Sequence, residues 1–411
     1  MRLRIATCAG KASAVRSGKQ GFRLSLRCPI CASAAAEEVE YRQNVPIAQN
    51  LMFRSRAEAL ACPVGTLRMV RCMVCGFAWN AAFEPALLRY GADYENDQSH
   101  SPAFARHLDA VARRIGRRMA GRRDISVLEV GCGQGDFLHR LAAVLDGRAR
   151  DLVGFDPAYR RSSPPAPSVR FDADSFNEET RARLNTPPDL VVARHVIEHV
   201  EDPLSFLRTL RSVCAVGVPL FVETPDVQWT LDGAVAHDLY YEHCSLFDSG
   251  SLRFALQAAG FAVEDVAPRF GGQYLLATAV AAADVAPALP ATRPSNANFQ
   301  ARKAAALDRL AAALRSDAAD GEIVAFWGGA SKSVTLALLL GEALAHVEAA
   351  IDINPERSGT FMPVTALPVV PPEAAQAAGI TKAYVANPQY LREIELWCRR
   401  RGWPLKLASI E

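Results

Sequence analysis

The sequence has little net charge and no long hydrophobic run. Its 411 residues carry 46 Lys and Arg against 44 Asp and Glu, which gives a formal net charge of +2. A protein that binds nucleic acid through its phosphates is expected to be strongly basic on one face. The longest apolar runs, around residues 336–340 and 277–283, are far shorter than the ~20 residues that span a bilayer. We therefore expect neither a nucleic-acid partner nor a membrane segment.

A disulfide framework is also lacking. Five of the ten cysteines stand in apolar surroundings and are predicted to be small core residues: Cys62, Cys132, Cys214, Cys244 and Cys398. Proteins of oxidising compartments rely on disulfide frameworks when their cores are small. A reducing cytoplasm is therefore the expected location.

The first residues of the chain are basic and contain no acidic side chain. Residues 1–36 hold seven Lys or Arg, including those near Cys8, and a transit peptide has a similar composition. However, the run is short, has no apolar stretch and contains three glycines. These features favour a disordered leader over residues 1–24.

Four cysteines are spaced as metal ligands. Cys28-Pro-Ile-Cys31 and Cys72-Met-Val-Cys75 form two CxxC pairs separated by 40 residues. Each CxxC makes a tight turn that directs two thiolates at one ion, and two such turns complete a tetrahedral shell with Zn–S distances of about 2.3 Å. Four protein ligands leave no open position for chemistry, so we predict a structural Zn²⁺ in a module over residues 25–85. Two disulfides, or four unrelated thiols, are the alternatives.

Short apolar runs alternate with amphipathic segments through the middle of the chain. Five runs are predicted as strands: residues 125–130, 151–155, 168–171, 189–193 and 218–223. Continuous Val, Ile and Leu indicate burial on both faces, as in a parallel sheet covered by helices on both sides. Helices are predicted over 86–120 and 251–260, and two further runs flanking Gly271-Gly272 form a hairpin at the sheet edge. This domain is predicted to cover residues 86–284.

A proline-rich linker over residues 285–296 separates a second, smaller α/β domain, predicted over residues 285–411. After an amphipathic helix, EIVAFWGGASKSVTLALLL reads as a strand, a glycine turn and a helix. The turn is not a P-loop, because no glycine directly precedes Lys332. It is either a plain strand-to-helix turn or a set of backbone N–H groups for an anion such as a diphosphate.

The sharpest motif is VLEVGCGQGDFL, in which an acidic residue is followed by alternate glycines. Glycines at such positions allow a sharp turn and let a ligand lie against the backbone. Acidic residues also end the next two predicted strands, in GFDP and FDADS. The series resembles the class I S-adenosylmethionine-dependent methyltransferases, with a Rossmann-type NAD domain as the alternative. The residues that carry it are Glu129, Gly131, Gly133, Gly135, Asp156 and Asp172.

The resemblance implies where these groups lie around S-adenosylmethionine. Glu129 and Gly131 would lie near the methionine end, Asp156 near the ribose and Asp172 near the adenine. The fourth strand ends in ARHVIEHVEDP, and residues at that place in the superfamily face the methyl donor and often the acceptor. His195 and His199 are therefore candidates, with a structural role as the alternative for each. The Asn/Asp-Pro-Pro-aromatic pattern of enzymes that methylate nucleic-acid bases is missing here.

The whole layout resembles the sugar C-methyltransferase family, which acts on nucleotide-activated 4-keto-6-deoxy sugars. Besides the cysteine pairs and the glycine motif, three stretches carry the likeness: YYEH (240–243), GGQYLLATA (271–279) and IDINPERSGTFMPVTALPVVPPE (351–373). The glycine turn departs from the family pattern, with Ser333 in place of its last glycine. The implied fold is α/β: a class I methyltransferase Rossmann-like seven-stranded sheet, an N-terminal four-cysteine zinc-binding module and a C-terminal Rossmann-like domain.

The family likeness also implies a mechanism and its residues. A carbon beside a ketone becomes a nucleophile when a base removes its proton, and histidine is a suitable base near neutral pH. By position His243 is that base, with Glu242 orienting its imidazole, Tyr240 donating to the enolate oxygen and His199 facing the same pocket. The zinc-binding module would form a wall over the acceptor.

Two other functions remain open at this point. One is O- or N-methylation of a sugar or another small molecule with the same cofactor. The other is a zinc-containing binding protein whose methyltransferase core has lost activity. The expected partner is a small-molecule acceptor, preferably a nucleotide sugar, and the expected state is a monomer or homodimer.

Overall fold

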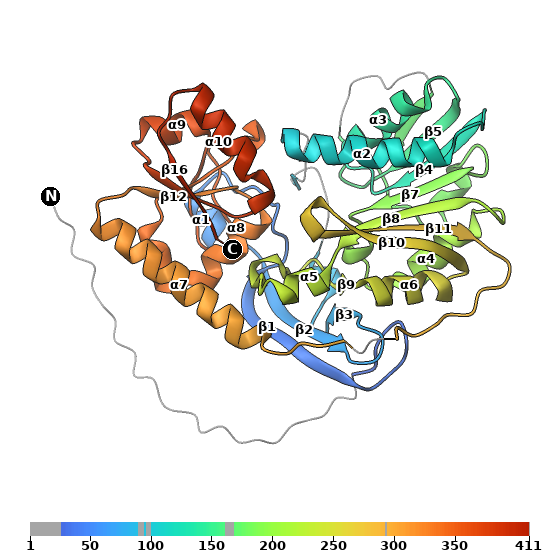
Figure 1. The fold of residues 1–411 in the computed structure, drawn as a ribbon, viewed down its shortest axis with the longest axis horizontal. Helices are drawn as coiled ribbons and strands as arrows, with labels where there is room; N and C mark the ends of the chain where they lie inside the picture. Colours follow the sequence, from blue (N-terminus) through green and yellow to red (C-terminus); the bar gives the residue numbers. More distant parts are fainter. Residues whose placement is uncertain (1–25, 89–93, 96–99, 161–167, 292–293, 411) are drawn as a thin grey trace.

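The computed structural model describes residues 26–88, 94–95, 100–160, 168–291 and 294–410, so the predicted leader lies outside the described residues. These residues form three β-sheets. Figure 1 shows two α/β units facing each other, with strands β1 and β2 of a smaller sheet running beneath and between them. Among the described residues, no helix combines the length and apolar character needed to cross a bilayer.

The N-terminal sheet is antiparallel and includes a strand from later in the chain. Strands β1 (Ala36–Pro46), β2 (Val64–Cys72) and β3 (Ala78–Asn80) pair in sequence order, and helix α1 (Arg56–Leu60) lies between the first two in sequence. The fourth strand, β9, is only Ser245–Leu246. It pairs with β3 and directly follows the YYEHC segment. The cysteine-bearing module is therefore hydrogen-bonded to the predicted active-site segment.

The middle unit contains the predicted seven-stranded sheet. Its strands are β4 (Ile125–Val130), β5 (Ala149–Phe155), β6 (Val169–Asp172), β7 (Leu190–Arg194), β8 (Pro219–Pro225), β10 (Phe261–Arg269) and β11 (Tyr274–Ala281). The order is β10-β11-β8-β7-β4-β5-β6, with β4 to β8 parallel and β11 antiparallel to both neighbours. The five predicted parallel strands and the edge hairpin are confirmed.

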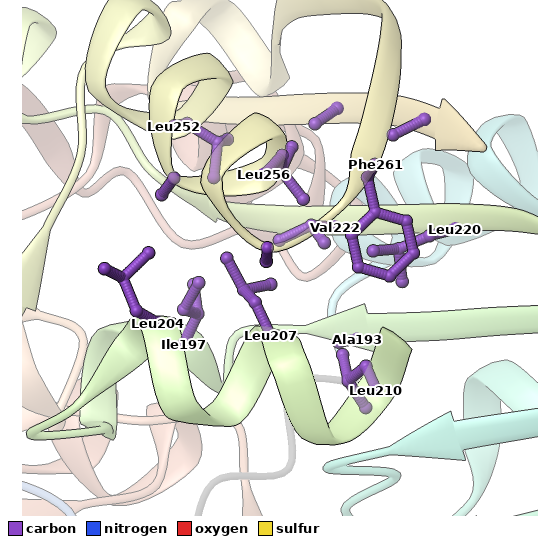
Figure 2. Packing of buried hydrophobic residues seen from close by; sticks show 14 of the residues in the cluster. Ala193, Ile197, Leu204, Leu207, Leu210, Leu220, Val222, Leu252, Leu256 and Phe261 are labelled. Carbon is purple, nitrogen blue, oxygen red and sulfur yellow. The ribbon is translucent and has the colours of Figure 1, made fainter. Parts of the chain in front are cut away.

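Helices cover both faces of this sheet, as the continuous apolar strands require. Within β4, Val127 packs with helices α2 (Pro102–Arg118) and α3 (Asp136–Leu145), whereas the next residue, Leu128, belongs to the cluster on the other face. That second cluster brings α4 (Pro203–Ser212) and α6 (Ser249–Ala258) against the sheet. Figure 2 shows its side chains, among them Leu204, Leu207, Leu210, Leu252, Leu256 and Phe261.

Where the structure describes residues 86–101, it does not contain the α-helix predicted over residues 86–120. A short 3-10 turn spans Pro85–Leu87, and the α-helix begins only at Pro102. Ser101 caps it, because its side chain accepts a hydrogen bond from the N–H of Phe104, and proline suits a first helical turn.

The C-terminal unit is a second parallel sheet. It follows the long helix α7 (Phe299–Ala319) and contains β12 (Val324–Trp327), β13 (Ala349–Ile351), β14 (Val369–Val370), β15 (Lys382–Val385) and β16 (Lys406–Ser409) in the order β14-β13-β12-β15-β16. The remaining helices are α5 (Val227–Asp232), α8 (Ser331–Leu340), α9 (Pro372–Ala377) and α10 (Leu391–Arg400). Further 3-10 turns are Thr180–Arg183, Ile197–His199, Ala236–Asp238, Phe270–Gly272, Gly341–His346, Pro355–Arg357 and Pro388–Tyr390.

Each parallel sheet reverses its strand order at its first strand. In the middle unit β4 lies between β5 and β7, and in the C-terminal unit β12 lies between β13 and β15. Ligands of open α/β sheets bind outside the carboxyl ends of the strands at such a reversal. The fold therefore offers two binding crevices, and the next question is whether they meet.

Candidate active site

One cavity of about 600 Å³ joins the two crevices. It is lined on one side by the loop after β4 and the end of β7, and on the other by the loops after β12, β13 and β15. The N-terminal module contributes Asn50, and Tyr94 lies beside it. The cavity therefore lies where all three parts of the chain meet.

The glycine loop after β4 forms a cradle along the cavity wall. Gly131, Gly133 and Gly135 all have positive φ, at 72°, 55° and 86°, a region that side chains with a Cβ rarely adopt. A Cβ at Gly131 would meet Val196 at 1.9 Å, and one at Gly135 would meet Phe171 at 2.4 Å. A Cβ at Gly133 would instead enter open space. That position is where a ligand can lie directly against the backbone.

Glu129 is a buried carboxylate with an unused oxygen beside this cradle. It is 1% exposed, and its Oε2 has no hydrogen-bond partner among the described residues. Burial raises its pKa to about 8, against the opposing effect of the Arg194 guanidinium. A buried carboxylate of this kind is stabilised by a cation or donor brought by a ligand. The ammonium group of S-adenosylmethionine fits that need.

Asp156 lies where a ribose is expected. Its Oδ2 accepts from the N–H of Gly133 and its Oδ1 from the N–H of Ala158, both at 2.8 Å. It lines the cavity, and burial raises its pKa above the ordinary value despite these two bonds. These bonds fix the carboxylate beside the glycine loop.

Asp172 is not among the residues that line the cavity. Its carboxylate instead accepts two hydrogen bonds from Arg183 at 2.8 and 2.9 Å. Ser175 and Phe176, a few residues further along, do line the cavity. Asp172 therefore does not line the cavity in this structure, and its expected place near the adenine stays a prediction.

His243 and His199 lie together at the centre of the site. Their ring centroids are 4.9 Å apart and nearly perpendicular. Burial lowers the pKa of His243 to about 4 and that of His199 to about 3. The Nδ1 atom of His243 is buried and has no hydrogen bond to the part of the chain that the structure describes. A neutral imidazole with a free nitrogen is the form that a general base requires.

The carboxylate of Glu242 lies near His199, and its expected role in orienting the His243 ring stays a prediction. Its Oε1 accepts from the N–H of Gln49 and its Oε2 from the hydroxyl of Tyr94, both at 2.8 Å. The same Oε2 lies 4.0 Å from Nδ1 of His199. Gln49 of the N-terminal module and Tyr94 therefore fix this carboxylate.

Tyr240 is hydrogen-bonded within the protein, and its expected role toward an enolate oxygen stays a prediction. Its hydroxyl donates to Oδ1 of Asp238 at 2.5 Å, and its ring packs edge-on against His243 with centroids 4.7 Å apart. Oδ2 of Asp238 forms an ion pair with Nζ of Lys332 at 2.8 Å. Asp238 was not predicted from the sequence, although it stands only two residues before Tyr240, because no local pattern indicates that the distant Lys332 pairs with it.

His195 adopts a left-handed backbone conformation, with φ of 53°, at the end of β7. Its Nδ1 lies 3.3 Å from Glu198, and its ring packs against Tyr274 with centroids 4.5 Å apart. It lines the cavity, so a role toward the cofactor stays a prediction.

Glu223 is a second residue that the sequence did not indicate. It is fully buried and accepts from Nε of Arg194 at 2.7 Å and pairs with Nε2 of His107 at 2.6 Å. Although burial works to raise its pKa, the Arg194 guanidinium and the His107 bond hold it below the ordinary value. This network fixes Arg194 beneath the cofactor side of the cavity.

The C-terminal wall repeats the cradle of the first crevice. Oδ2 of Asp352 accepts from the N–H of Gly329, and Oδ1 accepts from the N–H of Asn354, both at 2.8 Å. The sequence separations, 23 and 2 residues, equal those of the Gly133–Asp156–Ala158 set. The second crevice is therefore built for a ligand in the same way as the first.

The four predicted metal ligands converge outside this cavity. The Sγ atoms of Cys28 and Cys75 are 3.6 Å apart and those of Cys31 and Cys72 are 3.5 Å apart. All nine cysteines that the structure describes are free. Disulfide sulfurs are about 2.05 Å apart, whereas two edges of a tetrahedron with 2.3 Å arms are each about 3.8 Å. The arrangement fits one Zn²⁺ and excludes disulfides in this state.

Comparison with known proteins agrees with two of these units. A family of methyltransferase domains matches residues 104–266, and the family of C-methyltransferase C-terminal domains matches residues 288–394. Over 257 residues the chain is 28% identical to the C-methyltransferase NovU of Streptomyces niveus. The matched region is 57% of this chain and 60% of the length of that relative.

Solved structures resemble the chain only in part. The CurJ carbon methyltransferase is 16% identical with a TM-score of 0.35, covering 44% of this chain and 56% of its own. A complex between the Haloferax volcanii Trm112 methyltransferase activator and a methyltransferase contains a chain that is 15% identical with a TM-score of 0.36, covering 46% of this chain and 95% of its own. At these TM-scores neither likeness bears on function.

Proposed function

Because this chain belongs to the C-methyltransferase family, with a methyltransferase domain followed by a C-methyltransferase C-terminal domain, we propose that it methylates carbon in a small-molecule acceptor. The acceptor is a nucleotide-activated 4-keto-6-deoxy sugar, and S-adenosylmethionine is the methyl donor. The observation that carries the proposal is the buried imidazole of His243, which lines the cavity and whose Nδ1 has no hydrogen-bond partner among the described residues.

The residues of the first crevice hold the donor. Gly131, Gly133 and Gly135 keep the wall free of side chains, Glu129 receives the ammonium group and Asp156 the ribose hydroxyls. His195 lies on the same side of the cavity, at the end of β7. When bound there, S-adenosylmethionine supplies an electrophilic methyl group on a sulfonium.

The base removes one proton from the carbon beside the ketone. Nδ1 of His243 accepts that proton, and the C–H electron pair becomes the carbon–carbon double bond of an enolate whose negative charge lies on the former keto oxygen. The nucleophilic carbon is then free to take the methyl group, while His243 keeps the proton until the product leaves. The His199 ring packs against that of His243, and the Glu242 carboxylate lies 4.0 Å from His199, so a negative charge lies close to the pocket in which the imidazolium forms.

The second crevice supports a nucleotide as the handle of the acceptor. Asp352 accepts from two backbone N–H groups at the same sequence separations as those that bind Asp156. The first residues of helix α8 line the cavity. Ser333, in its first turn, is 1% exposed, and its Oγ lacks a hydrogen-bond partner within the described ranges. Backbone N–H groups and a hydroxyl at a helix N-terminus suit a diphosphate.

The cysteine cluster suits a structural Zn²⁺. Cys28, Cys31, Cys72 and Cys75 fill all four positions of a tetrahedral shell, so the metal would have no open site for the acceptor. We further propose a cytoplasmic enzyme that works as a monomer or homodimer and has no nucleic-acid partner.

Deuterium exchange without methyl transfer tests the proposal directly. The protein is incubated in D₂O with a thymidine-diphosphate 4-keto-6-deoxy sugar and S-adenosylhomocysteine, and mass spectrometry follows deuterium at the carbon beside the ketone. We expect exchange with the native chain and none with His243→Asn, while S-adenosylmethionine binding by calorimetry stays intact. Exchange that survives His243→Asn assigns the base to another residue.

The alternative, O- or N-methylation, is favoured only if no carbon-bound proton exchanges while a methylated product still forms. That product would carry its new methyl group on oxygen or nitrogen. The same mass spectra therefore separate the two functions.

A further inference from the structure

Lys332 reaches from the C-terminal unit to the segment that bears the base. It stands in the first turn of α8, and its ammonium lies 2.8 Å from Oδ2 of Asp238. Both side chains are largely buried, at 11% and 7% exposure, and Nζ also lies 5.2 Å from the ring centre of Trp229. An ion pair so shielded from water is screened weakly by salt.

The same carboxylate holds Tyr240. Oδ1 of Asp238 accepts the hydroxyl of Tyr240 at 2.5 Å, and the Tyr240 ring packs against that of His243. A continuous series of contacts therefore runs from Lys332 through Asp238 and Tyr240 to His243. Three of its members come from one six-residue stretch, whereas the cation comes from another unit almost 90 residues later.

Without this cation the arrangement is not expected to persist. A buried carboxylate that loses the cation paired with it is strongly disfavoured and either takes up a proton or turns toward water. A protonated Asp238 is a donor, so it no longer offers the same acceptor to the Tyr240 hydroxyl. The pKa of Asp238 is held below its ordinary value, since the Lys332 ammonium and the Tyr240 bond outweigh the effect of burial.

We propose that Lys332 is a positioning residue for proton abstraction, which holds Asp238 as the acceptor of the Tyr240 hydroxyl and thereby sets the Tyr240 ring against His243. The base is then in place only when the C-terminal unit is docked on the methyltransferase unit. The proposal rests on the proposed function in that His243 is taken as the base. It differs from a role in anion binding, in which Lys332 would contact only the acceptor.

The chain offers a matched control. Lys303 of helix α7 also crosses between units, with Nζ 2.6 Å from Oε2 of Glu40 and side-chain exposures of 16% and 2%. It does not line the cavity. Lys303→Met therefore removes a shielded ion pair between units without touching the site.

The first experiment measures the deuterium exchange described above in four variants: Lys332→Met, Lys332→Arg, Asp238→Asn and Lys303→Met. We expect Lys332→Met and Asp238→Asn to lower the maximal exchange rate by about 100-fold, as for a misplaced catalytic group, with unchanged KM for the sugar nucleotide. Lys332→Arg recovers part of the rate, and Lys303→Met matches the native chain. A raised KM with an unchanged maximal rate would overturn the proposal and make Lys332 an anion-binding residue.

The Lys332→Met/Asp238→Asn double variant tests the pairing. If both act through one contact, its exchange rate equals that of either single variant, whereas independent roles multiply the losses. Multiplied losses therefore contradict the proposal.

A second measurement does not depend on the identity of the base. In protein labelled with ¹³C at the tyrosine ring, the Tyr240 signal, assigned with Tyr240→Phe, should shift in Lys332→Met and stay in place in Lys303→Met. An unshifted signal overturns the positioning role even if exchange is lost. A shifted signal together with exchange that survives His243→Asn means that the base assignment failed and the Lys332 contact did not.

Discussion

The backbone N–H of Asn80 donates to the carbonyl oxygen of Cys244 at 3.0 Å, which joins the cysteine module to the residue that follows His243. Strand β3, which begins three residues after Cys75, also pairs with Ser245 and Leu246. The proposed zinc site is therefore separated from the proposed base by two short strands. This connection makes the metal testable through the activity of the site.

Removal of the metal should stop proton exchange without abolishing cofactor binding. The glycine loop belongs to a separate seven-stranded sheet, whereas the His243 segment depends on β3. We expect a strong chelator, or Cys72→Ser, to stop deuterium exchange while S-adenosylmethionine still binds by calorimetry. Inductively coupled plasma mass spectrometry should find one zinc per native chain. Full exchange in metal-free protein contradicts this coupling.

Arg71 is a second link between the same parts. It is completely buried and donates to Oδ2 of Asp248 and to Oε1 of Gln228, both at 2.7 Å, and to the carbonyl of Gly76 at 3.1 Å. Removing one partner of a buried ion pair costs about 3–5 kcal/mol. Arg71→Met should therefore lower the free energy of unfolding, measured in urea, by about that amount.

Arg68, on the same strand, provides the control for Arg71. Its ion pair with Glu38 is exposed, at 35% and 47%, and such pairs contribute about 0–1 kcal/mol. Arg68→Met should therefore leave the urea midpoint nearly unchanged. Equal losses in the two variants would show that burial is not what makes Arg71 important.

Much of the fold was predictable because it follows from local patterns. The alternation of apolar runs predicts the sheet, and E-x-G-x-G-x-G predicts the cradle that contains Gly133. The site was less predictable, because its geometry depends on residues distant in sequence. Glu242 turned toward His199 since Gln49 and Tyr94 bind it, and Asp172 is held by Arg183. None of these three partners forms part of a sequence motif.

The buried histidines should make the protein sensitive to acid. Burial lowers the pKa of His199 and His237 to about 3 and that of His243 to about 4, from 6.5 in the unfolded chain. Between these values the unfolded state binds more protons than the folded state, so stability falls as pH drops below about 6.5. Each histidine contributes a slope of up to roughly 1.4 kcal/mol per pH unit.

Two measurements check this acid sensitivity. Thermal unfolding between pH 7 and pH 4 should give a falling Tm, with a smaller slope in His237→Gln, a variant outside the cavity lining. In the same range the exchange rate should stay high until pH approaches the pKa of His243 near 4, because a base must be unprotonated to act. An acid limb centred at 6.5 would mean that a solvated histidine is the base.

Glu129 should lower the stability of the cofactor-free protein at high pH, and its charge should become favourable only when the cofactor binds. Its folded-state pKa of about 8 lies above the ordinary 4.5 because of burial, so the folded state keeps a proton that the unfolded state releases. Stability without cofactor is thus lost as pH rises from about 4.5 toward 8. Glu129→Gln cannot ionise, so its Tm should exceed that of the native chain at pH 8.5 and match it near pH 5.

The same variant should bind S-adenosylmethionine more weakly by calorimetry, because an amide cannot neutralise the ammonium group. A variant with native affinity would mean that the ammonium group binds elsewhere, although Oε2 of Glu129 is buried without a hydrogen-bond partner among the described residues.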